Sequence, residues 1–150
     1  MMQILDKLWV SDSDGIHKVE SGGLLNVAHD LKGIKFWPKV EYAQIGLING
    51  PGNEVSDYCS AILFLKGMLR RHDKVIVYDH NGSIGFAVVV MYLNLIEGQH
   101  RPEHNSWSRW LTWEEKTEII YKRLEIGRVA VHEAHIEAFN KIKWSLLEVL

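Results

Sequence analysis

The sequence predicts an α/β protein with a central, mainly parallel, twisted sheet of four to five strands covered by helices on both faces. Short apolar runs alternate with longer segments of helical period, which favours parallel strands joined by right-handed crossovers. The β-branched run at 75–77 is typical of a strand buried on both faces. Residues 86–96 are apolar almost all the way round, as in a helix at the middle of a domain. With 150 residues, 47% of them hydrophobic, the chain suits one domain over residues 1–150.

The first half of the chain is expected to supply three strands and one helix. Gly22 and Gly23 break the chain before the second strand, and residues 49–53 are the densest turn signal. The following helix should begin near Val55, because apolar residues recur every three to four positions from there to Leu69. The other expected ranges are a strand at 3–10, a short helix or turn at 14–21, a strand at 24–28, a loop or weak strand at 33–42 and a strand at 43–48.

The second half is predicted to add the central strand, the buried helix at 86–96 and two more helices. Thr112 and Glu115 have the spacing of a capping box, so a helix should begin there and end near Ile126. A last helix should run from about Val131 to Leu146, with one apolar face made of Ala134, Ala138, Ile142 and Leu146.

A tryptophan-rich insertion and its helix, at about 105–127, differ in composition from the rest of the domain. Trp107, Trp110 and Trp113 fall within seven residues. These side chains could form a lid or a stacking platform over a binding site. They could instead anchor the inserted helix by burial, which is the commoner role of aromatic side chains.

The segment Asp79-His80-Asn81-Gly82-Ser83-Ile84-Gly85 joins the buried strand to the buried helix. Such a loop is an anion cradle, because the N–H groups of a helix's first turn lack partners and the positive end of the dipole lies there. Ligands of parallel sheets bind at the C-terminal ends of the strands, where this loop is expected. Residues 79–85 are therefore the candidate ligand-binding site, and His80 is the side chain there that can change protonation near neutrality.

The chain resembles a dual-specificity phosphatase of the protein tyrosine phosphatase superfamily, from about 4 to 102 and again near 132–142. Members carry a His-Cys-x-x-Gly-x-x-Arg-Ser loop between a buried strand and a buried helix, and residues 78–86 are the best match to it. The resemblance implies the fold of that family for this chain. Further matches are 4–12 with the opening strand, 25–28 with the second strand, and 48–58 with the general-acid loop and the start of the following helix.

All three catalytic residue types of that family are missing at the matching positions. The alignment puts Asp79 at the nucleophilic cysteine, Gly85 at the phosphate-binding arginine and Asn49 at the general-acid aspartate. Asn49 precedes Asp79 by 30 residues, close to the spacing of the family. Moving the frame by one residue puts Tyr78 or His80 at the nucleophile position and still supplies no cysteine or arginine.

These replacements exclude phosphatase activity of the family type. The family's reaction needs a low-pKa thiolate that attacks phosphorus, and an arginine that binds the phosphate oxygens in bidentate fashion. A carboxylate at Asp79 would repel a phosphate by roughly 4 kcal/mol at about 4 Å and an effective dielectric constant near 20. Asn49 cannot give a proton to a leaving oxygen. No residue is therefore assigned a catalytic role in phosphate hydrolysis.

Two hypotheses for function follow. The first is an inactive phosphatase-like module that binds a protein partner or a small-molecule ligand through the loop pocket, residues 79–85 with Asn49. The second is a repurposed enzyme in which Asp79 is base or nucleophile, and His80 or Asn49 positions a substrate that is not a phosphomonoester, such as a nucleotide-like small molecule. A carboxylate held by N–H groups is a stabilised anion and a weak base, which favours the first hypothesis.

Asp79 is further expected to act as a plug that fills the vacated phosphate site with its own carboxylate. In that position the carboxylate would cap the helix that begins near Gly85 or Phe86. Hydrogen bonds from the loop N–H groups would depress the pKa of Asp79 in the folded protein.

Composition limits the remaining possibilities. A net charge of −2 and a pI near 6.4 argue against a general nucleic-acid binder. Cys59 is the only cysteine, which excludes an internal disulfide and suits a reducing compartment. No signal peptide and no apolar run of about 18 residues is visible, so a cytoplasmic location and no membrane contact are expected. The sequence does not indicate an oligomeric state.

The spacing of the eight histidines gives only weak support for a metal site. His132 and His135 are three residues apart on a predicted helix, and His100 and His104 are four apart near a loop. Neither pair has the His-Glu-x-x-His pattern of a zinc site, so solvated side chains are the expected state. We expect neither a metal nor a cofactor.

Overall fold

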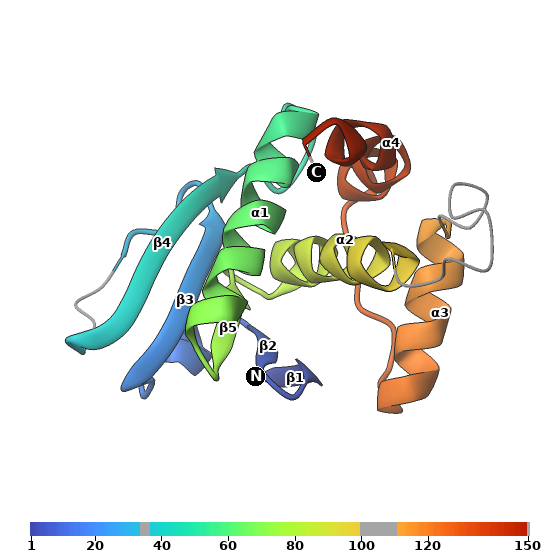
Figure 1. The fold of residues 1–150 in the computed structure, drawn as a ribbon. Coiled ribbons are helices and arrows are strands. Elements are labelled where there is room, and N and C mark those ends of the chain that lie inside the picture. The colour runs from blue at the N-terminus through green and yellow to red at the C-terminus, as the bar shows by residue number, and fades with distance from the viewer. Residues whose placement is uncertain (34–36, 100–110, 150) are drawn as a thin grey trace.

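The computed structural model describes residues 1–33, 37–99 and 111–149, and its centre is a five-stranded sheet (Figure 1). The strand order is β1-β2-β5-β3-β4, with β1 antiparallel to β2 and every other neighbouring pair parallel. This arrangement confirms the predicted fold class. The strands are β1 (Met2–Leu5), β2 (Leu8–Ser11), β3 (Ser21–Ala28), β4 (Lys39–Leu47) and β5 (Val75–Tyr78).

Two strand predictions were wrong in detail. The single strand expected at 3–10 is a hairpin, because Asp6 and Lys7 form a turn between β1 and β2. The break expected at Gly22 and Gly23 lies within β3. A Cβ atom at Gly22 would lie 2.4 Å from the Lys74 carbonyl oxygen, so this glycine allows a close approach between two chain segments. The pairing of β3 therefore continues through it.

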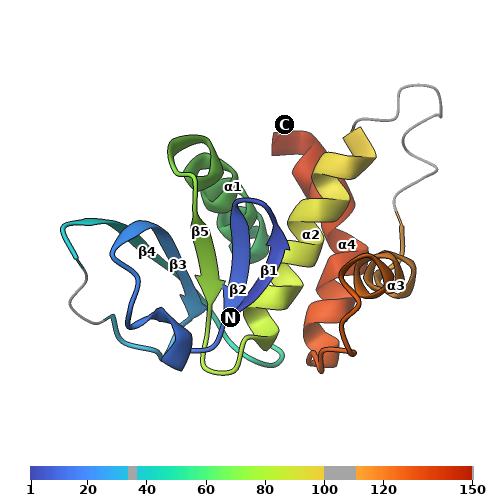
Figure 2. The same cartoon turned by 90° about the horizontal axis from the view of Figure 1, so that it is seen from below.

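In the part of the chain that the structure describes, four α-helices lie on one side of the sheet (Figures 1 and 2). The core on that side joins side chains of β2, β3 and β5 to side chains of all four helices. In both views α3 lies farthest from the sheet, against α2 and α4. The helices are α1 (Val55–Arg71), α2 (Ser83–Gln99), α3 (Trp113–Leu124) and α4 (Glu133–Val149).

The second face of the sheet carries a short 3-10 helix, η1 (Asp14–Ile16), in place of an α-helix. A small cluster forms beneath it from Ile16, Val19, Leu24, Ile76 and Tyr78. Among the described residues, this single turn is all that meets the prediction of helices on both faces. The α-helices α1 to α4 all follow β4 in the chain, and they pack on the opposite face of the sheet.

Helix α2 is the centre of the larger core. Its residues from Ile84 to Leu95 are all buried, which confirms the prediction drawn from their composition. Burial of one large apolar side chain of this kind contributes about 1.5–3 kcal/mol. The helix begins at Ser83, three residues earlier than predicted. The candidate loop is correspondingly shorter, and its last residues belong to the first helical turn.

Helix α3 is anchored by burial and by a buried ion pair. The Trp113 ring packs edge-on against Phe86 and Phe139, with ring centres 6.3 and 5.5 Å apart. The Lys116 ammonium is buried and donates a hydrogen bond to the Glu97 carboxylate on α2. Thr112 and Glu115 form the predicted capping box. Trp113 thus anchors the helix, whereas Trp107 and Trp110 lie outside the described residues.

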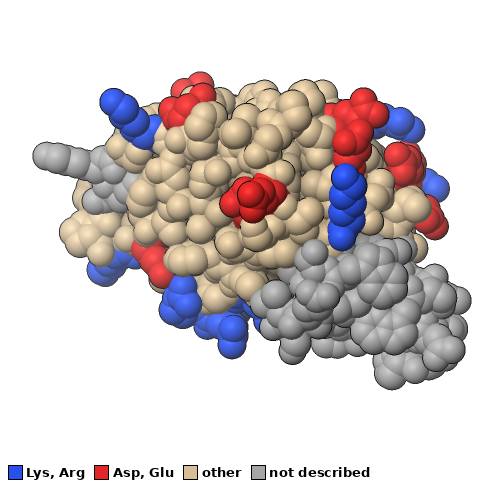
Figure 3. Space-filling view, turned by 90° about the horizontal axis from the view of Figure 1, so that it is seen from above, with Lys and Arg blue, Asp and Glu red and all other residues tan. Residues whose placement is uncertain are grey.

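Charged side chains are spread thinly over the face seen from above in Figure 3. Most of the lysines and arginines that are visible lie near its edge, and one basic group stands farther in, beside an acidic group. Within the described ranges, no helix is both long and apolar enough to cross a membrane.

Candidate functional site

The loop after β5 is closed by its own aspartate. Asp79 directly follows the buried Tyr78, and its carboxylate turns back to the first turn of α2. One carboxylate oxygen accepts a hydrogen bond from the Ile84 N–H and the other from the Gly85 N–H, both at 3.2 Å. Only 1% of Asp79 is exposed. The N–H groups that form an anion cradle therefore already hold an acceptor from within the chain.

Burial changes the expected electrostatics of Asp79. We expected hydrogen bonds from the loop to depress its pKa, but desolvation by burial raises the pKa above the ordinary value. The N–H groups of Gly85, Ile84 and Gly82 oppose this effect without overcoming it. For the ionised carboxylate relative to its protonated form, the loss of hydration outweighs the hydrogen bonds from these three neutral donors.

Two other residues shape the loop. Gly82 has a φ of +87°, a left-handed conformation that favours glycine. It is the residue that the sequence comparison places at the glycine of the family motif. The Asn81 side-chain oxygen accepts hydrogen bonds from the Ser83 N–H at 3.0 Å and the Ser83 hydroxyl at 2.7 Å. The side chains of Asn81 and Asp79 together accept hydrogen bonds from the first N–H groups of α2. The loop therefore forms one compact turn.

Gly85 brings α2 close to the sheet. A Cβ atom at this position would lie 3.1 Å from the Val77 carbonyl oxygen and 3.4 Å from a Val10 methyl carbon. A longer side chain would have to push the helix away from β5. The position matched to the family's arginine is thus a contact between helix and strand, which is a structural reason for glycine there.

His80 turns outward and pairs with a different aspartate. Its Nε2 atom lies 2.8 Å from an Asp30 carboxylate oxygen, and about half of each side chain is exposed. The hydrogen bond from His80 is the main cause that lowers the pKa of Asp30. Asp30 follows β3, the neighbour of β5, so the pair joins the C-terminal ends of two adjacent strands. His80 thus pairs with Asp30, although Asp79 is its neighbour in the sequence.

Asn49 is held by α4. Its side-chain oxygen lies 3.0 Å from His135 Nε2, and His135 Nδ1 lies 2.7 Å from the Tyr58 hydroxyl. Asn53 in turn donates to the Tyr58 oxygen at 3.1 Å. If His135 carries its proton on Nε2, each group donates to the next, from Asn53 through Tyr58 and His135 to Asn49. Asn49, which the resemblance matches to the general acid, is therefore the end of a hydrogen-bonded chain.

His135 is fully buried and was not recognised from the sequence as part of this region. Desolvation, followed by the nearby His132, lowers its pKa to about 4, so the ring is neutral at pH 7. The signal that could have found it is its spacing from Ala138, Phe139 and Ile142, which are buried on the same side of α4. The face predicted for this helix was thus centred one residue too early. Among the described residues, no three histidine, cysteine, aspartate or glutamate side chains gather as metal ligands.

Solved structures with the same fold are dual-specificity and related phosphatases. Human DUSP28 matches with a TM-score of 0.68 and 14% identity over 100% of both chains. The tyrosine phosphatase OH1 of Orf virus matches with 0.70 and 15% over 98% of this chain and 87% of its own. The human tyrosine phosphatase-like serine/threonine/tyrosine-interacting protein matches with 0.66 and 14% over 100% of this chain and 98% of its own. No protein-family model and no curated protein matches the sequence.

The raised pKa of Asp79 predicts how stability depends on pH. Between the unfolded pKa of about 3.9 and the higher folded pKa, the folded protein binds more protons than the unfolded chain. The free energy of unfolding of the wild type, relative to Asp79→Asn, should therefore fall as the pH rises from about 4. Urea unfolding at several pH values measures this difference. Asp73→Asn, which removes a fully exposed carboxylate, is the control variant. A wild-type stability that rises with pH relative to Asp79→Asn would instead show that the pKa of Asp79 is depressed.

Removal of the Asp79 carboxylate should open the cradle. In Asp79→Ala the N–H groups of Ile84 and Gly85 lose their acceptor, which should lower the free energy of unfolding by about 2 kcal/mol. Asp79→Asn retains one acceptor and should cost less. Tungstate should bind the Ala variant more tightly than the wild type in titration calorimetry. An Ala variant that is as stable as the wild type and also fails to bind tungstate would show that Asp79 does not act as a plug.

Proposed function

We propose that this chain is a catalytically inactive, phosphatase-like protein that binds a protein partner through the loop end of its sheet. The observation that carries the proposal is the contact of the Asp79 carboxylate with the Ile84 and Gly85 N–H groups. In either protonation state, this side chain occupies the donors that an incoming phosphate would need. The residue that blocks the cradle stands where the reaction requires a thiolate.

The other two positions support the same conclusion. Gly85 offers no cation for phosphate oxygens, and its close contact with Val77 leaves little room for one. Asn49 has no acidic proton, and its amide oxygen is engaged by His135. Each of the three positions thus carries an internal contact in place of a catalytic group.

The alternative, an enzyme that uses Asp79 with His80, has less support. A buried carboxylate with a raised pKa is a feature of some general acids and bases. A substrate would have to reach Asp79, however, and only 1% of that residue is exposed. His80, to which the alternative assigns the positioning of a substrate, bonds to Asp30.

The binding surface is assigned to the outward side chains of the same end. His80, Asn81, Asp30 and Asn49 are all exposed there, whereas Gly82–Gly85 are buried. An exposed group of polar side chains around a closed loop suits a protein surface better than a small anion. One neighbour of the same fold is described as phosphatase-like and as an interacting protein, which agrees with such a role.

The purified protein should not hydrolyse p-nitrophenyl phosphate or phosphotyrosine peptides above the blank. Asp79→Cys alone should not restore activity, because Gly85 provides no arginine. Combining Asp79→Cys, Gly85→Arg and Asn49→Asp should give a trace at most, together with a lower unfolding midpoint, because the new side chain at 85 meets Val77. Turnover by the wild type that is lost in Asp79→Ala, or high activity of the single cysteine variant, would contradict the proposal.

Partner binding is tested by capture from the cells that express the chain. The double variant His80→Ala with Asp30→Ala removes an exposed pair without leaving either member unpaired, so folding should be unaffected. A protein that is retained by the wild type should be lost from this variant. Lys39→Ala, an exposed residue at the opposite ends of the strands, is the matched control and should retain it. Equal retention by both variants would place the binding surface elsewhere.

A further inference from the structure

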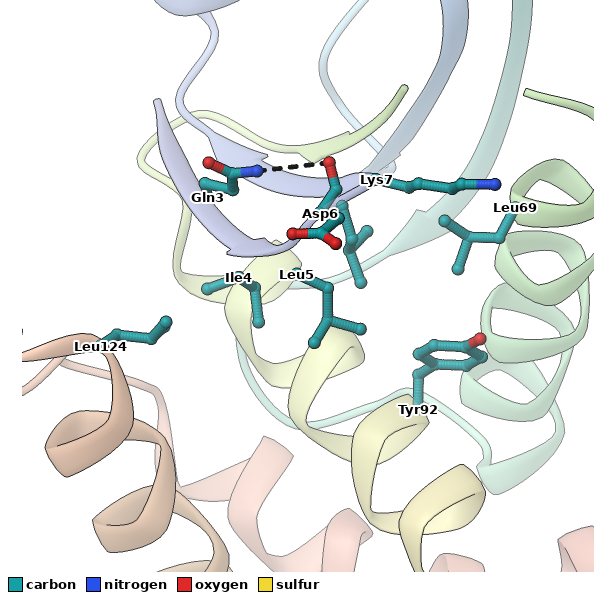
Figure 4. Close-up of a pocket in the computed structure, with 9 residues that line it drawn as sticks. Gln3, Ile4, Leu5, Asp6, Lys7, Leu69, Tyr92 and Leu124 are labelled. Atoms are coloured by element: carbon teal, nitrogen blue, oxygen red, sulfur yellow. Dashed lines mark hydrogen bonds between the residues drawn. The ribbon is translucent and has the colours of Figure 1, made fainter. Parts of the chain in front are cut away.

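A hollow lies at the opposite end of the sheet from the loop. It has a volume of about 620 Å³, within the range of small-molecule sites. The β1–β2 hairpin forms one wall, and α1, α2 and α3 contribute the others (Figure 4). Its apolar lining comes from Ile4, Leu5, Leu69 and Leu124.

Tyr92 gives this hollow a polar group that lacks a partner. Only 8% of the residue is exposed, and burial raises the pKa of its hydroxyl. No described residue forms a hydrogen bond with that hydroxyl, although buried tyrosine hydroxyls usually have a partner. Figure 4 shows the Tyr92 ring among the lining side chains, with the hydroxyl toward α1 and Leu69. An unsatisfied donor beside an open cavity is positioned for a ligand oxygen.

Lys7 supplies a cation at the same side. In Figure 4 its ammonium extends toward α1 and Leu69, as the Tyr92 hydroxyl does, whereas the Asp6 carboxylate lies on the side of Ile4 and Leu5. The ion pair of Lys7 is with Asp73, at 3.6 Å. Asp73 is fully exposed, so this pair is weak and can give way to a ligand.

We propose that this hollow binds a small amphiphilic carboxylate, such as a medium-chain fatty acid. The apolar chain would lie on the leucine and isoleucine side chains, and the carboxylate would accept hydrogen bonds from the Lys7 ammonium and the Tyr92 hydroxyl. An anion is favoured because both polar groups on that side are donors. A cationic head group would leave Tyr92 and Lys7 facing a positive charge.

This site is separate from the loop proposed to bind a partner. Lys7 precedes β2 at the end where Leu8 pairs with Val75, whereas Asp79 follows β5 at the end where Ser11 pairs with Tyr78. The strands β2 and β5 are parallel, so the two sites lie at opposite ends of the same pair. Loss of one site therefore need not affect the other.

The test is titration calorimetry with decanoate, below its micelle concentration, on the full chain. The wild type should bind one equivalent, decanol more weakly, and decylamine most weakly. Lys7→Gln and Tyr92→Phe should each weaken decanoate binding about tenfold, as expected for loss of a hydrogen bond to a charged group. Lys18→Gln, at an exposed lysine outside the lining, is the matched control and should bind as the wild type does.

Tyr92→Phe also separates binding from folding. The change removes one oxygen that has no partner within the described structure, so the unfolding midpoint should stay the same or rise. Absence of decanoate binding by the wild type, unchanged affinity in both variants, or tighter binding of decylamine would each overturn the proposal. Asp79→Ala should bind decanoate as the wild type does. This variant therefore separates decanoate binding at the hollow from the proposed role of the loop.

Discussion

The hydrogen bonds from Ile84 and Gly85 to the Asp79 carboxylate are the constraint on which the site depends. The first turn of a buried helix has N–H groups that need an acceptor, and here water cannot supply one. An active phosphatase of this fold would leave these donors for its substrate. In this chain a side chain takes them permanently, and α2 can begin in the interior with its donors satisfied. Since α2 is the centre of the larger core, the closed loop serves the stability of the whole domain.

Asn49, the residue matched to the general acid, is likewise engaged by a side chain of the same molecule. Asn49 lies at the end of the hydrogen-bonded chain that runs through His135 and Tyr58, so the turn after β4 is joined to α4. A neutral, buried histidine suits this structural role, since the charged form would lose solvation without gaining a carboxylate. Two positions that the resemblance matches to catalytic residues thus carry internal contacts in this chain. The polar groups that remain exposed around them are the ones to which we assign the proposed partner surface.

Among the described residues, the two ends of the sheet differ in whether their buried hydrogen-bond donors have partners. At the loop end, the donors of α2 are occupied and the pocket is filled from within. At the hairpin end, the Tyr92 hydroxyl is buried beside a cavity without a described partner. A ligand gains the most binding free energy where it forms a hydrogen bond to a buried polar group that has no partner in the protein. Folding has already removed water from such a group, so binding does not have to do so. This difference explains why a small ligand is assigned to the hairpin end and a protein surface to the loop end.

The sequence by itself determined the fold class, the central strand and helix, and the absence of cysteine and arginine from the loop, because these follow from local composition and motif spacing. It also indicated that Asp79 would cap the helix, since the separation of Asp79 from the first helical turn is short. The raised pKa of Asp79 and the neutral state of His135 were decided by tertiary structure, because desolvation depends on every element packed around a group. The hairpin at Asp6 and Lys7, the pairing of His80 with Asp30, and the contact of Gly85 with Val77 likewise required the packed chain. Each of these joins segments whose distance in space the order of residues does not specify.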